Sequence, residues 1–256
     1  MKLKITLIFL LILPSRFSKA QYYLSGQDPA SIRWQQIQTP YFRLIFPKGH
    51  FEQARKLAFL TQHSYPFVNE GLKAKKVKSD LVLHTSSSIS NATVAWAPRR
   101  LDYFHTPSQD GYSQEWYRQL SVHELRHIAQ ISSLNSGFGK GLSFLFGQQA
   151  TAAVLGVFIP NWFLEGDAVV SETVHSNSGR GRQSLFEAGL RAQLLEMGAF
   201  SYDKAYFGSY RHHVPNIYEL GYYYVGYQRH LHGEALWQQV LNTTARQAYR
   251  LNPFSY

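Results

Sequence analysis

The chain contains no cysteine among its 256 residues, and this absence limits how the protein can be stabilised and what it can bind. It cannot carry a disulfide framework, so a hydrophobic core must hold the fold unaided. It also cannot be a lipoprotein attached through an N-terminal cysteine. Any zinc would have to be held by histidine and carboxylate side chains, because no thiolate is present.

Dense runs of basic residues are missing too, although 26 Lys and Arg stand against 16 Asp and Glu. The tightest cluster, Lys73, Lys75, Lys76 and Lys78, is most simply a solvated loop. We therefore expect no nucleic-acid partner. The formal net charge is +10, and it becomes +6, with 22 basic against 16 acidic residues, if the first 20 residues, which hold four of the basic residues and no acid, are removed. This balance favours non-specific attraction to anionic surfaces, so we expect that any association with the cell envelope is peripheral.

The N-terminal apolar run is too short for a bilayer-spanning helix, which needs about 20 apolar residues. Lys2 and Lys4 introduce the run from Ile5 to Leu13, and Ser18-Lys19-Ala20 follows it. This order is typical of a secretory signal peptide, so we expect residues 1–20 to be removed. An uncleaved membrane anchor is the alternative. The sequence thus predicts an exported protein that is periplasmic, outer-membrane-associated or secreted, and it leaves the oligomeric state open.

Residues 21–256 are long enough for one large domain. The strand patterns come first, at 34–46, 81–84 and 91–106. Helical recurrence of apolar residues is found at 50–72, 116–133, 163–174, 184–197, 218–231 and 235–248. We predict an α+β fold, with a sheet-containing part at about 34–133 and a helical part at about 142–256. The chain could also be the N-terminal part of a longer protein.

The uncharged segment 142–163 has two interpretations. Gln148 and Gln149 interrupt its apolar run. A buried helical hairpin is the simpler interpretation, and a loop that dips into a membrane is the alternative.

The segment His123–His127 reads His-Glu-Leu-Arg-His and has HExxH spacing within a predicted helix. Two histidines four residues apart lie on one face of a helix, so their imidazole nitrogens can converge on one ion. Glu124 then lies beside the ion and can carry a proton from water to a leaving amine. A chain of this composition would contain the motif by chance only about 0.02 times. Apolar neighbours such as Val122 and Ile128 weaken the alternative of two surface histidines.

A second motif, Asn-Trp-Phe-Leu-Glu-Gly-Asp-Ala at 161–168, follows downstream. HExxH followed by W-[FL]-x-E-G-x-A resembles the gluzincin zinc peptidases, which include the M1 aminopeptidases and the wider peptidase MA-like group. The 37 residues between His127 and Glu165 are more than is usual in the M1 group, and the insertion at 142–160 is closer to the peptidase MA-like members. The resemblance implies a zincin (thermolysin-like) fold, in which a mixed sheet and an active-site helix precede a mainly helical lobe. It also implies that Zn²⁺ is bound by His123, His127 and Glu165.

Two acidic residues near this motif have more than one possible role. Asp167 and Glu172 are alternatives for binding the metal or supporting its ligands. Glu172 follows Glu165 by two helical turns and could orient a ligand histidine. A structural ion pair or a plain surface charge is the alternative for Glu172.

The resemblance further implies an oxyanion-stabilising tyrosine downstream. Tyr222, Tyr223, Tyr224 and Tyr227 lie in the expected window, and we select Tyr222, with core packing of this helix as the alternative. The aminopeptidase motif GAMEN is absent, because the corresponding segment 95–100 reads Ala-Trp-Ala-Pro-Arg-Arg. The sequence therefore leaves open whether the protein is an endopeptidase or an exopeptidase.

These observations predict an exported zinc metallopeptidase that acts on peptides or proteins, with Glu124 as the general base. The alternative is a catalytically silent binding module of the cell envelope that keeps the zincin fold. Glu124 argues against that alternative, because a purely structural metal site would not need a base.

Overall fold

The structure is a computed structural model that describes residues 28–250, apart from 110 and 113. The predicted signal peptide at residues 1–20 lies outside the described residues. The sheet is formed by β1 (Trp34–Gln38), β2 (Phe42–Pro47), β3 (Ser79–His84), β4 (Ala92–Trp96) and β5 (Arg99–Phe104). The helices are α2 (Phe51–Val68), α3 (Trp116–Leu134), α4 (Gly137–Phe146), α5 (Gln148–Phe158), α6 (Asn161–Val174), α7 (Ser184–Met197), α8 (Tyr202–Phe207), α9 (Ile217–His232) and α10 (Leu236–Gln247), with a 3-10 turn η2 (Arg180–Arg182).

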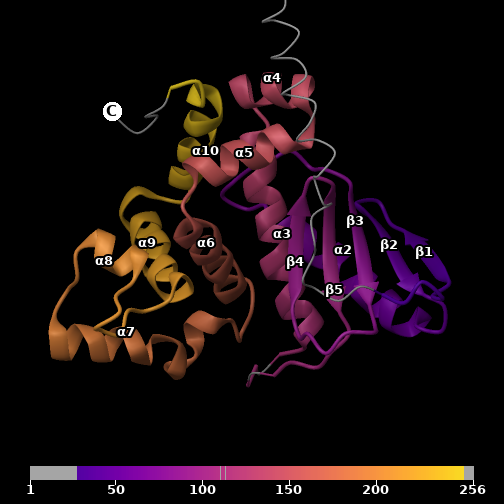
Figure 1. Cartoon of the computed structure of the whole chain (residues 1–256), viewed down its shortest axis with the longest axis horizontal. Helices are drawn as coiled ribbons and strands as arrows, with labels where there is room; N and C mark the ends of the chain where they lie inside the picture. Colours follow the sequence, from indigo (N-terminus) through magenta and orange to yellow (C-terminus); the bar gives the residue numbers. More distant parts are fainter. Residues whose placement is uncertain (1–27, 110, 113, 251–256) are drawn as a thin grey trace, which may run out of the picture.

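The five strands form one mixed sheet in the order β1-β2-β3-β5-β4. The central strands β2, β3 and β5 are parallel, and the outer strands β1 and β4 each pair antiparallel with their neighbour. All regular secondary structure after α3 in the described chain is helical, and this helical part lies beside the sheet (Figure 1). The predicted α+β class, with a mixed sheet followed by a mainly helical part, is confirmed.

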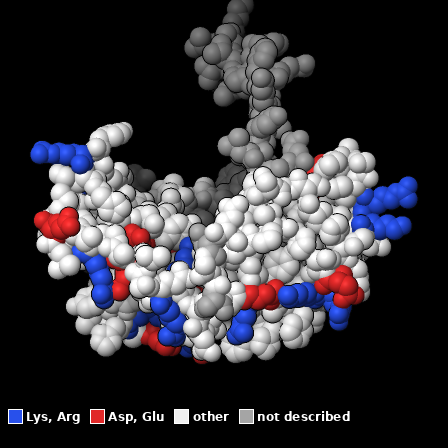
Figure 2. All heavy atoms as spheres, turned by 90° about the horizontal axis from the view of Figure 1, so that it is seen from below, with Lys and Arg blue, Asp and Glu red and all other residues white. Residues whose placement is uncertain are grey.

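The charged side chains are spread out on the end of the molecule opposite α4 and α5. Figure 2 shows Lys and Arg interspersed with Asp and Glu there, with wide uncharged areas between them. Pairs such as Lys56–Glu115 and Arg191–Glu187 place opposite charges 2.9 Å apart. On this face, the net positive charge does not gather into one continuous patch.

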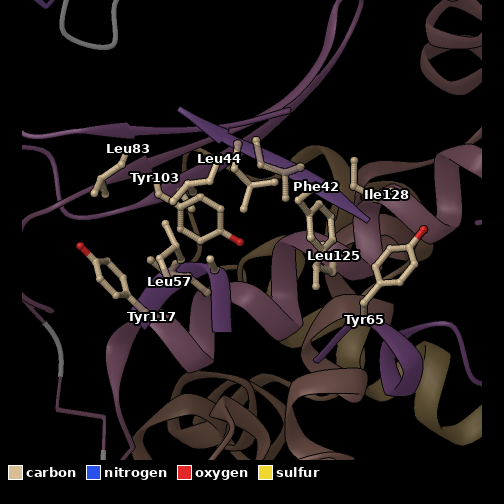
Figure 3. Packing of buried hydrophobic residues seen from close by; sticks show 14 of the residues in the cluster. Phe42, Leu44, Leu57, Tyr65, Leu83, Tyr103, Tyr117, Leu125 and Ile128 are labelled. Atoms are coloured by element: carbon tan, nitrogen blue, oxygen red, sulfur yellow. The ribbon is translucent and has the colours of Figure 1, made fainter. Parts of the chain in front are cut away.

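The sheet packs against α2 and α3 through residues that alternate along the strands. In β2 and β3 every second side chain is buried, as expected for strands with one covered face. Leu44, Leu83 and Tyr103 from the sheet meet Leu57 of α2 and Leu125 of α3 (Figure 3). Because Leu125 lies inside the HExxH segment, the same packing that builds the core also fixes the rotation of α3.

The helices α6 and α9 approach each other closely at two glycines. A Cβ atom on Gly166 would lie 2.1 Å from the backbone carbon of Gly221, and one on Gly221 would lie 1.8 Å from the Trp162 carbonyl oxygen. Larger residues at either position would force the helices apart. This close contact places the first turn of α9 next to Glu165.

The uncharged segment forms two helices, α4 and α5, but they are not buried. Among their residues, only Gly139, Thr151 and Val154 are buried. The preferred interpretation of a buried hairpin is therefore wrong, because apolar composition alone does not separate a core helix from one with an exposed apolar face. No single described helix is long and apolar enough to cross a membrane; α5 and α6 meet that test only as a pair bent by 98°.

Candidate metal centre

Helices α3 and α6 bring together three side chains that could hold a metal ion, His123, His127 and Glu165. The Nε2 atoms of His123 and His127 are 3.2 Å apart. Oε2 of Glu165 lies 3.1 Å from Nε2 of His123 and 3.6 Å from Nε2 of His127. The histidines meet because four residues make about one helical turn, and the carboxylate comes from α6, which packs on α3.

The charges of this group depend on one another. Burial opposes protonation of His127, but the Glu165 carboxylate outweighs it and raises the pKa of His127 to about 9. Burial alone would raise the pKa of Glu165, but hydrogen bonds from His123 and His127 hold it well below its usual range. Glu165 is therefore ionised at neutral pH, and the pocket favours a positive charge between the three side chains.

Glu172 supports His123 from the side away from Glu165. Its Oε2 lies 3.1 Å from Nδ1 of His123, and its side chain is fully buried. When Nδ1–H donates to this carboxylate, the lone pair of Nε2 stays free for an ion. Arg180 holds Glu172 in place, with Nε 2.8 Å and its backbone nitrogen 3.0 Å from Oε1. Nη2 of Arg180 lies 2.7 Å from the same His123 nitrogen and 3.2 Å from Oε2 of Glu172. Because a guanidinium can only donate, Nδ1 accepts from Arg180 when the His123 proton is on Nε2, and Nδ1–H donates to Glu172 in the other tautomer.

Gln130 supports His127 in a similar way. The Gln130 amide nitrogen donates to the Leu164 carbonyl at 2.9 Å and to Oδ2 of Asp167 at 2.8 Å. Both amide hydrogens are therefore used, so the amide oxygen faces Nδ1 of His127 at 2.9 Å. Nδ1–H of His127 donates to that oxygen, so Nε2 is the nitrogen that faces Glu165 and that could bind an ion in place of its proton.

Asp167 is part of this support and does not contact the three candidate ligands. Its two oxygens accept from Nε and Nη2 of Arg126 at 2.6 and 2.8 Å. Arg126 also donates to the Val68 and Glu70 carbonyls, both at 2.7 Å. Burial alone would raise the pKa of Asp167, but the Arg126 guanidinium lowers it, so the pair is ionic. Of the two alternatives for Asp167, the structure places it in the supporting position.

Glu124 is buried beside the candidate ligands and lines the same cleft. Burial raises the pKa of its carboxyl group above the usual value, and nearby His123 partly offsets this effect. A carboxylate with a raised pKa binds a proton more readily near neutral pH, which is the property that a general base requires.

The cleft has a volume of about 560 Å³, and the candidate ligands lie along it. One wall is β4, through Ala92, Thr93 and Val94. β4 is an outer strand of the sheet and pairs only with β5 among the described strands, so its free edge is available on the cleft side. The arrangement can hold an extended chain next to the candidate ligands.

Tyr218, not Tyr222, is the tyrosine of α9 that reaches this cleft. The rings of Tyr218 and His123 are 6.3 Å apart, and the Arg180 guanidinium lies 4.7 Å from the Tyr218 ring centre. Burial, together with the Glu165 charge, raises the pKa of Tyr218 to about 12, so its hydroxyl is protonated at neutral pH. Tyr222 packs edge-on against Phe186 with 5.8 Å between ring centres. The prediction of Tyr222 as the site tyrosine is therefore corrected to Tyr218.

The physical reason is the place where α9 begins. Asn216 and Glu219 form a capping box that starts the helix at Ile217, and the close contact of α6 and α9 places this first turn beside the candidate ligands. Tyr222 lies four residues, about 6 Å, further along the helix. The capping pattern Asn-x-x-Glu is visible in the sequence and indicates where α9 begins, but it does not indicate which face of α9 meets α6. Gln130 and Arg180 were not predicted from the sequence either. Arg180 begins the short 3-10 turn η2 within a Gly/Ser-rich stretch that gives no such signal.

No known protein-family model matches the chain, and a search of curated proteins finds no similar sequence. The candidate site is therefore interpreted from its own geometry and chemistry.

Proposed function

We propose that the chain is a zinc-dependent metallopeptidase of the gluzincin type, built on a zincin fold. The observation that carries the proposal is the convergence of His123, His127 and Glu165 at one point of the cleft, with Glu124 beside them. Peptide hydrolysis needs a metal site open to substrate and a base next to it, and this group of residues offers both.

The distances within the group fit zinc. Ligand atoms bound at about 2.0–2.1 Å in a tetrahedron are about 3.3–3.4 Å from one another. The three separations here are 3.1, 3.2 and 3.6 Å. Two imidazoles and one carboxylate form a donor set found at catalytic zinc, where the fourth position is left to water or substrate. When bound, zinc supplies a Lewis acid that lowers the pKa of water and polarises a carbonyl group.

The protein's own residues account for the remaining requirements. Glu124 accepts a proton from the attacking water and delivers it to the leaving amine. The protonated Tyr218 hydroxyl donates a hydrogen bond to the oxygen that becomes negatively charged. The free edge of β4 aligns the substrate backbone by strand pairing. Glu172 and Gln130 offer acceptors to Nδ1–H of the two histidines, and this bonding leaves each Nε2 to an ion.

Metal content and chelator sensitivity test the proposal. We expect the purified protein to hold one zinc ion and to cleave casein, and we expect a chelator to stop cleavage and added zinc to restore it. His123→Ala should lose both metal and activity, because two ligands cannot hold zinc in an open site. His230→Ala, at an exposed position on α9, is the matched control and should behave as wild type. Wild-type protein without bound metal would contradict the proposal, and bound zinc without cleavage of any peptide library would favour the binding module.

A paired tyrosine substitution tests the oxyanion role. Tyr218→Phe should lower kcat by about 10²-fold with little change in KM, because the lost hydrogen bond acts in the transition state. Tyr222→Phe should leave kcat within about twofold of wild type, since this ring lies outside the cleft. Equal effects of the two substitutions on kcat, measured with the same fluorogenic peptide, would contradict the placement of Tyr218.

A further inference from the structure

The α4–α5 hairpin carries the most exposed cluster of large apolar side chains on consecutive described residues. Phe144 is 89% exposed, Leu145 70% and Phe146 67%. These three residues, called here the apolar tip, end α4 immediately before Gly147 turns the chain into α5. Exposed apolar side chains scattered singly are ordinary, but a contiguous group marks a surface that binds something.

Three basic residues lie on the segments next to this tip. Lys140 is exposed on α4 itself. Gln148, the first residue of α5, accepts a hydrogen bond from the Arg99 backbone nitrogen at 2.9 Å, and Nε of Arg99 donates to the Lys78 carbonyl at 3.1 Å. Lys78 is exposed as well. Lys78, Arg99 and Lys140 are called here the basic rim.

Acidic residues are absent from this part of the sequence. None occurs between Glu124 and Glu165. The acid at the start of β3, Asp80, is already paired with Arg43 at 2.6 Å. The rim therefore keeps its positive charge next to the apolar tip.

We propose that the apolar tip of the α4–α5 hairpin inserts into the surface of an anionic phospholipid membrane, with the basic rim on the lipid headgroups. Aromatic and aliphatic side chains enter the boundary between headgroups and acyl chains, and lysine and arginine add attraction to anionic lipids. The hairpin lies on the membrane and does not cross it, since α6, which follows α5, is largely buried in the protein. This inference is independent of the metal chemistry.

Fluorescent labelling tests the proposal at one position. Because the chain has no cysteine, Leu145→Cys provides a single site for an environment-sensitive dye. Leu185→Cys is the matched control, because Leu185 is 86% exposed on α7, at the other end of the molecule (Figure 1). Both variants carry the same N-terminal segment, so a difference between the two labels reports on the hairpin.

The probes are vesicles of phosphatidylcholine alone and of an equimolar mixture with phosphatidylglycerol. We expect the emission maximum of the dye at position 145 to shift to shorter wavelength on the mixed vesicles, and nitroxide lipids to quench this emission. Added salt should reverse the shift, because it screens the attraction between the basic rim and the anionic lipids. The label at 185 should not respond. Lys140→Gln should weaken binding about fivefold and Lys48→Gln, at an exposed position before α2, should not.

Three results would overturn the proposal. The first is an unchanged label at 145 on mixed vesicles, with the circular dichroism of the labelled protein matching wild type. The second is an equal response at 185. The third is a blue shift that grows with protein concentration in the absence of vesicles, which would assign the apolar tip to contact with a second copy of the chain.

Discussion

Replacing Glu124 with glutamine is expected to lower kcat for peptide hydrolysis by about 10²–10⁴-fold and to leave the bound zinc in place. Glutamine has nearly the same size as glutamate but cannot accept a proton from water. Glu124 is not one of the three converging side chains, so the ligands remain intact. Steady-state kinetics with a fluorogenic peptide and elemental analysis of the same protein sample measure the two quantities.

The control for this substitution is Glu115→Gln at the start of the same helix. Glu115 pairs with Lys56 at 2.9 Å and is partly exposed, so its loss should change kcat little. Full activity in Glu124→Gln would exclude the role of Glu124 as the base. Loss of zinc together with activity would instead mean that Glu124 holds the metal centre together.

The parts of the site that sequence could predict are those fixed by short-range geometry. His123 and His127 lie together because they are one turn apart on a single helix, and the distance of 3.2 Å between their Nε2 atoms follows from that spacing. Glu165 came from a motif on a different helix, and its place depends on how α6 packs against α3. The α+β class followed from the order of strand and helix patterns along the chain.

The choice of tyrosine could not be made from distance along the chain. Tyr218 and Tyr222 lie on the same helix, and only the close approach of α6 and α9 at Gly166 and Gly221 decides which one reaches the cleft. Arg180 has no periodic pattern around it, yet its contacts with Glu172 place it beside His123. Long-range packing, which single-residue patterns do not encode, decides both positions.

The ion pair of Arg126 and Asp167 explains why an arginine occupies a variable position of the HExxH motif. Both side chains are buried, at 2% and 0% exposure, and Asp167 also fixes Gln130, which orients His127. One buried pair thus connects the stability of the α3–α6 contact to the geometry of a candidate metal ligand. Replacing either partner should therefore affect both properties.

Arg126→Met is expected to lower the free energy of unfolding by about 3–5 kcal/mol, because it leaves the Asp167 carboxylate buried without a cation beside it. It should also weaken zinc binding by about 10–100-fold, since Gln130 and then His127 lose their fixed orientation. Urea unfolding of the metal-free protein measures the first effect, and competition with a metal-binding dye measures the second.

Two further variants distinguish the loss of an ion pair from the burial of an unpaired charge. Arg126→Met combined with Asp167→Leu should recover much of the stability, because no unpaired charge stays buried, but it should not recover the zinc affinity. Arg55→Met breaks the exposed pair with Glu52, in which both side chains are 69% exposed, and should cost no more than about 1 kcal/mol. If Arg126→Met costs no more than Arg55→Met, the buried pair does not stabilise the α3–α6 contact. If it destabilises the protein but leaves zinc affinity unchanged, Gln130 orients His127 without help from Asp167.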